Sequence, residues 1–212
     1  METSGKDITL RLEKVNSYIH AIGILFGIIS MPFLIKNADE DGQSLTVAGA
    51  IIYALCFLMV FISSTLYHGL PPSRKKENWK IIDHISIYFL IAGTYTPFIL
   101  IFVNNVFGNT LLVILWSLTL LGMIFKIFFT GSLEILSTLV YLFMGWILFA
   151  DSKTFFKNMP PMIIELVTLG GILYTIGIIF YLWQKYTYHH VIWHVFVLAA
   201  AICHYAAVLL AV

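Results

Sequence analysis

The chain has 212 residues, of which 60% are hydrophobic and only 11% are charged. A soluble domain of this length would be about a quarter charged, so the composition excludes that class and indicates an integral membrane protein. The formal net charge of +1 gives no electrostatic reason to expect a nucleic-acid partner.

Seven apolar stretches are long enough to cross a bilayer as helices, since a span takes about 20 residues. They cover residues 18–35, 45–67, 81–103, 110–129, 133–150, 163–183 and 191–212. The polar stretches between them, among them 36–43, 69–80 and 151–161, are expected to be loops too short for a second domain. The sequence therefore predicts an all-α integral membrane fold, a single seven-transmembrane-helix bundle over residues 1–212.

The distribution of lysine and arginine predicts how this bundle is oriented. Residues 1–14 are polar, unlike a cleavable signal peptide, whose core is apolar. With the N-terminus inside, the cytoplasmic ends of the helices hold nine basic residues: Lys6, Arg11, Lys14, Arg74, Lys75, Lys76, Lys80, Lys126 and Lys185. The outer ends hold three: Lys36, Lys153 and Lys157. By the positive-inside rule we expect a multi-pass protein of the cell membrane, with a cytoplasmic N-terminus and an external C-terminus.

Histidines gather at the predicted cytoplasmic end of the bundle. His190 and His194 open the last apolar stretch four residues apart, so a helix presents both imidazoles on one face. His68 closes the second stretch at the same depth. Polar groups in hydrocarbon are costly without partners, and three histidine ligands with an open fourth position are typical of a catalytic zinc site. The sequence therefore predicts zinc as a cofactor, with His68, His190 and His194 as its ligands.

Two further residues are assigned catalytic roles. Asp83 begins the third stretch at the same depth, where it could orient a zinc-bound water and accept its proton. Ser64 lies one turn before His68, from where it could donate a hydrogen bond to a ligand, to Asp83 or to a substrate oxyanion.

Each polar residue also has a simpler interpretation. Ser64 could bond to the preceding helical turn, and Asp83 could form a salt bridge with Lys80 or Arg74. Ordinary interfacial residues are the expectation for the remaining candidates His84, His189 and His204. The meeting of the predicted ligands, Asp83 and Ser64 at one depth favours the metal site over these separate explanations.

The combined motifs resemble those of the hemolysin III and progestin/adipoQ receptor family. They are Ser64-x3-His68, the run DHISIYFLIAGTYTPF over residues 83–98, His190-x3-His194, and the opening motif Glu13-x2-Asn16-x3-His20-x2-Gly23. The resemblance covers nearly the whole chain. With no long polar domain ahead of the first span, we expect a compact member of the bacterial type.

The resemblance implies seven helices, an inner N-terminus and zinc near the cytoplasmic face. In the receptor branch, the residues that match His68, His190 and His194 hold the zinc, and a water bridges it to the aspartate that matches Asp83. The wider group includes membrane hydrolases such as alkaline ceramidases. Glu13, Asn16 and His20 fall on one face of the first helix, either to support the site or to pack that helix.

Two functions remain open at this point. The first is a zinc-dependent hydrolase of a membrane lipid with a ceramide-like amide or an ester bond. The second is a non-enzymatic protein with a structural zinc, acting as a membrane-stress regulator, a sensor or a pore-forming cytolysin. A pore predicts polar residues along a whole track, and the outer halves of the helices hold few: Thr94, Tyr95, Tyr174, Thr175 and His204. This scarcity disfavours a channel.

Overall fold

The computed structural model describes residues 2–40 and 42–212, with side chains from Asp7 onward. The helices are α1 (Glu2–Glu40), α2 (Ser44–Gly69), α3 (Arg74–Phe102), α4 (Val106–Phe129), α5 (Glu134–Trp146), the 3-10 helix η1 (Ile147–Asp151), α6 (Ser152–Phe156), α7 (Pro161–Leu182) and α8 (His189–Ala211). Over this described part of the chain there is no strand. Seven helical segments are long and apolar enough to cross a membrane, the fifth formed by α5, η1 and α6 together. The predicted all-α seven-span membrane fold is confirmed.

Several helices extend beyond the apolar stretches that predicted them. The first runs to Glu40, and α3 already begins at Arg74, where the Ser73 side chain accepts a hydrogen bond from the Lys76 amide at 3.2 Å. The predicted loops are therefore wrong over residues 36–40, 74–80 and 152–156, which are helical. Hydropathy marks where hydrocarbon ends, whereas the helical backbone continues as long as its own hydrogen bonds and caps allow.

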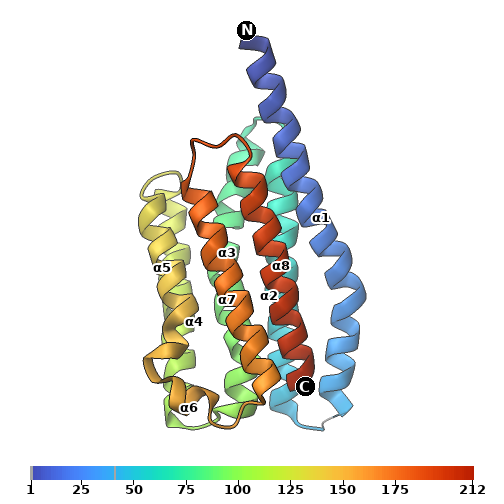
Figure 1. Cartoon of the computed structure of the whole chain (residues 1–212), viewed down its shortest axis with the longest axis vertical. Coiled ribbons are helices and arrows are strands. Elements are labelled where there is room, and N and C mark those ends of the chain that lie inside the picture. The colour runs from blue at the N-terminus through green and yellow to red at the C-terminus, as the bar shows by residue number, and fades with distance from the viewer. Residues whose placement is uncertain (1, 41) are drawn as a thin grey trace.

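The helices lie side by side with the two termini at opposite ends of the bundle (Figure 1). The first helix lies at the edge, against α2 and α8, and its N-terminal part projects beyond the other helices. The end of α2 and the beginnings of α3, α5 and α8 come together at the N-terminal end of the bundle. This topology brings the predicted site residues to one end, as expected. That this end faces the cytoplasm stays a prediction, and Lys6, one of the nine basic residues, lies outside the described side chains.

Close packing between α2 and α3 depends on a glycine. A Cβ at Gly49 would lie 2.9 Å from Cα and 3.3 Å from Cβ of Pro97, and this backbone cannot move aside cheaply. Small residues at such crossings allow membrane helices to approach closely. We expect Gly49→Ala to destabilise the fold by about 1–3 kcal/mol, the usual cost of overpacking, and to lower the thermal midpoint in detergent. Gly145→Ala is the matched control because nothing lies within 4 Å of its Cβ position. Equal midpoints for the two variants would contradict this account.

Candidate metal centre

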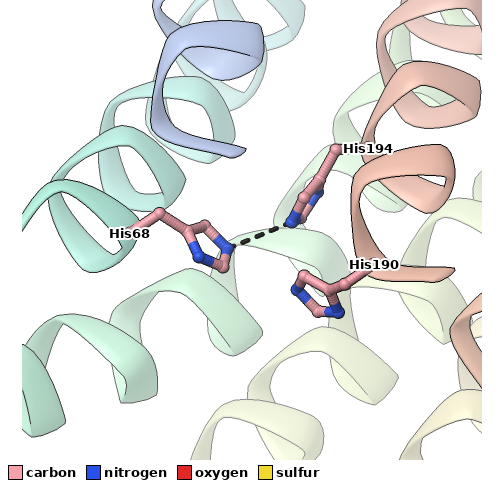
Figure 2. A group of neighbouring side chains, drawn as sticks. All are labelled: His68, His190 and His194. Atoms are coloured by element: carbon pink, nitrogen blue, oxygen red, sulfur yellow. Dashed lines mark hydrogen bonds between the residues drawn. The ribbon is translucent and has the colours of Figure 1, made fainter. Parts of the chain in front are cut away.

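Three histidines from two helices converge at the N-terminal end of the bundle. His68 lies in the last turn of α2, and His190 and His194 lie in the first two turns of α8. Figure 2 shows the rings turned toward one another across the gap between these helices. One ring nitrogen from each residue lies within 4.8 Å of the others, and Nε2 of His194 is 3.1 Å from Nε2 of His68. His68 and His194 are buried, with 3% and 4% exposed, and His190 is half-buried.

This arrangement fits a metal ion held by imidazoles. Two nitrogens at about 2.0–2.1 Å from a tetrahedral zinc are about 3.3 Å apart, so the His68–His194 pair already has the spacing of two ligands. The third nitrogen, within 4.8 Å of these two, has at most about 1.5 Å to move, which a small rotation of the His190 side chain can supply. The three predicted ligands therefore form a group that could hold a metal ion.

Asp83 and Ser64 face the same space from α3 and α2. The Ser64 hydroxyl lies close enough to the Asp83 carboxylate to act on it as a hydrogen-bond donor, and both side chains are buried. Across the described residues, no lysine or arginine lies within ion-pair distance of Asp83. The salt bridge of Asp83 with Lys80 or Arg74 is thus not found. Both residues line one cavity together with His190 and His194.

That cavity has a volume of about 360 Å³ and lies inside the bundle. Four of the five predicted site residues line its N-terminal end, His68 being the exception. The walls continue past the middle of α3 to Phe98, Phe155 and His204. Most of the lining side chains are apolar or aromatic, among them Ile87, Leu90, Ile91, Trp146 and Ile178. Its shape and lining suit a long apolar group whose polar end lies at the histidines.

The first helix contacts two of the three histidines. Support of the site was one of the two roles that the sequence allowed for its polar face. Oε1 of Glu13 lies 3.3 Å from Nδ1 of His68, and Nε2 of His20 lies 2.7 Å from Nδ1 of His194. Lys76 of α3 donates to the other Glu13 oxygen at 2.5 Å. Their spacing put Glu13 and His20 on one helical face but did not choose between site support and helix packing. These contacts show that the polar face of α1 supports the histidines in addition to packing the helix.

A second polar cluster lies beside the site. Lys126, counted from the sequence as a basic residue at a helix end, is fully buried and pairs with Glu134 at 2.6 Å. Glu134 also accepts from the Gly131 amide at 2.8 Å and lies 3.6 Å from Nδ1 of His84. The backbone turns sharply here, with Gly131 at φ 85° and Leu133 at φ 54°. This cluster fixes the turn between α4 and α5 against α3.

The structure gives two other histidines specific partners inside the protein. His84 is half-buried, and its Nδ1 lies 3.6 Å from Glu134. His204 lies inside the bundle, where Nε2 is 3.2 Å from the carbonyl oxygen of Val167 and the ring packs against Gly170. Both cases have one cause: depth along a helix can be read from the sequence, but rotation about its axis cannot when apolar residues surround the helix.

Comparison with known proteins gives the family. The family model described as Haemolysin-III related matches residues 8–205. The "Hemolysin-3 homolog" of Bacillus subtilis (strain 168) is 43% identical over 201 residues, which cover 95% of this chain and 94% of that protein. "Hemolysin-3" of Bacillus cereus is 39% identical over 197 residues, with 93% and 90% covered.

More distant relatives include the human "Monocyte to macrophage differentiation factor", 26% identical over 201 residues, which cover 91% of this chain and 81% of that protein. No solved structure matches the chain. The resemblance inferred from the motifs is confirmed: the chain belongs to the Haemolysin-III related family of multi-pass membrane proteins.

Proposed function

We propose that the protein is a zinc-dependent hydrolase that cleaves an amide or ester bond in a membrane lipid. One observation carries the proposal. The ring nitrogens of His68, His190 and His194 lie close together, and two of these histidines line one end of a largely apolar cavity together with Asp83 and Ser64. A metal site, a proton acceptor and a place for an acyl chain are what hydrolysis of such a lipid requires.

Zinc suits the donor set of His68, His190 and His194. Imidazole nitrogens are preferred by zinc, and three protein ligands with a free fourth position are the common arrangement in catalytic sites. When bound, zinc supplies Lewis acidity and lowers the pKa of a coordinated water to about 7.

The residues of this chain divide the remaining tasks. Asp83, buried beside the histidines, accepts the proton from the attacking water and later returns it to the leaving amine or alcohol. Ser64, next to Asp83 in the cavity wall, donates a hydrogen bond that orients the carboxylate during the reaction. The apolar cavity wall holds the acyl chain, so that the amide or ester group of a ceramide-like lipid stops at the histidines.

A non-enzymatic role with a structural zinc is the alternative, as a sensor, a membrane-stress regulator or a cytolysin. Asp83 favours it if its carboxylate binds the metal directly, because a fourth protein ligand closes a zinc site. The names of the two bacterial relatives refer to hemolysis, which favours the cytolysin.

The deciding experiment is an assay of purified, zinc-loaded protein in lipid nanodiscs. A panel of ceramides, N-acyl amides and ester-linked lipids is supplied, and released fatty acid is measured by mass spectrometry. We expect release from at least one class, loss of release when a chelator removes the metal, and recovery when zinc is added back. Absence of product from every lipid, with one zinc bound per chain, would reject the hydrolase and leave the structural site.

A further inference from the structure

Three buried or half-buried residues of α1 form one face directed at the metal centre. Glu13, Asn16 and His20 stand at positions i, i+3 and i+7, which share one side of a helix. Glu13 lies 3.3 Å from Nδ1 of His68, and His20 lies 2.7 Å from Nδ1 of His194. In both contacts, the nitrogen involved is the one that points away from the other ligands.

The hydrogens in this chain of rings follow from counting donors and acceptors. Glu13 is a carboxylate paired with Lys76, so it accepts a hydrogen from Nδ1 of His68. Without a metal, Nε2 of His68 is then an acceptor, and it receives a hydrogen from Nε2 of His194 at 3.1 Å. Nδ1 of His194 is left as an acceptor for a hydrogen on Nε2 of His20. The Nδ1 atom of His20 therefore carries a lone pair in the metal-free state.

A bound metal would reverse the direction of the hydrogen bond between His194 and His20. If a metal were held by Nε2 of both His68 and His194, the two nitrogens that lie 3.1 Å apart, the hydrogen of His194 would have to sit on Nδ1. That hydrogen is donated to Nε2 of His20, and His20 in turn carries its own hydrogen on Nδ1. The contact between His68 and Glu13 keeps its direction, since Nδ1 of His68 donates in both states.

Two polar atoms beyond the last ring of this hydrogen-bonded series have no hydrogen-bond partner among the described residues. They are Nδ1 of His20 and Oδ1 of Asn16, both buried, on residues one helical turn apart. Each of these atoms is therefore free to take a partner. Once His20 carries its hydrogen on Nδ1, the same two atoms become a donor and an acceptor.

We propose that Glu13, Asn16 and His20 of α1 are positioning residues that set the tautomers of two metal ligands, and that metal binding draws His20 and Asn16 into a hydrogen bond. The inference rests on the proposed metal site but not on hydrolysis. Each chain of hydrogen bonds then ends in an oxygen acceptor: the Glu13 carboxylate behind His68 and the Asn16 amide behind His20. This gives the spacing Glu-x2-Asn-x3-His a single physical reason.

Zinc affinity measured by chelator competition tests the positioning role. His20→Gln keeps an acceptor at the place of Nε2, whereas His20→Asn keeps a polar atom only at the place of Nδ1. We expect His20→Asn to weaken zinc binding by about 10–100-fold, as is usual when the partner of a metal-bound histidine is lost, and His20→Gln to fall between it and wild type. Asn16→Leu should weaken binding by about tenfold.

The matched control for helix packing is Ser17→Ala. Ser17 lies on the same helix at the same depth and donates to the carbonyl oxygen of Thr65 at 2.9 Å, and it forms no hydrogen bond with any of the described histidines. We expect wild-type zinc affinity in this variant. Equal losses in Ser17→Ala, His20→Gln and His20→Asn would mean that α1 acts only by packing, and would overturn the proposal.

Nuclear magnetic resonance of protein with ¹⁵N-labelled histidine reads the tautomers directly. We expect His20 to carry its hydrogen on Nε2 in the metal-free protein and on Nδ1 in the zinc-loaded protein, with the His20→Asn variant identifying its signals. An unchanged tautomer on zinc binding would overturn the inference while leaving the metal site intact. Failure of wild-type protein to bind zinc at all would instead reject the site itself.

Discussion

Replacement of Asp83 by Asn should lower the rate of lipid hydrolysis by about 10²–10⁴-fold, the usual effect of losing a general base. Asparagine has nearly the same shape and still accepts the hydrogen bond from Ser64, but it cannot take a proton from water. Because the three histidines remain, zinc content should stay close to one per chain. The measurement pairs fatty-acid release in nanodiscs with metal analysis of the same sample.

Ser64→Ala is the natural companion of this variant. Its hydroxyl only orients the carboxylate, so we expect a smaller loss of rate than in Asp83→Asn, again with full zinc. If Asp83→Asn instead loses zinc and unfolds at lower temperature, and wild type hydrolyses none of the lipids, the carboxylate is a fourth ligand of a closed structural site.

His190→Ala and His194→Ala should each remove most of the bound zinc and lower the thermal midpoint. A ligand present at 100 times its dissociation constant stabilises the folded state by about 2.7 kcal/mol, and this stabilisation disappears with the site. The control is His189→Ala, which removes the neighbouring imidazole but no proposed ligand. Full zinc content in either ligand variant would contradict the assignment of that residue.

Most of the fold could be predicted from the sequence because the bilayer simplifies the problem. Stretches of about 20 apolar residues mark the spans, and seven of them fix an antiparallel course with the termini at opposite ends. The ends of the helices could not be predicted this way. Residues 36–40 and 74–80 are mostly polar yet helical. Backbone hydrogen bonding and caps such as Ser73 at the beginning of α3, not hydropathy, decide where a helix begins and ends.

The depth of the site was predictable, but its contacts were not. His190 and His194 share a face by their spacing, and the topology brings His68 to the same end. Which way α1 turns its polar face depends on packing against α2 and α8, which no spacing within α1 reveals. For that reason the direct contacts of Glu13 and His20 with the ligands needed the structure, as did the burial of Lys126 against Glu134.

Anomalous X-ray diffraction from crystals of the purified protein, recorded on both sides of the zinc absorption edge, tests the central claim most directly. We expect a single strong zinc peak about 2.0–2.1 Å from one ring nitrogen each of His68, His190 and His194. It would be contradicted by zinc-supplemented crystals in which these three rings are clearly ordered and no anomalous peak lies between them.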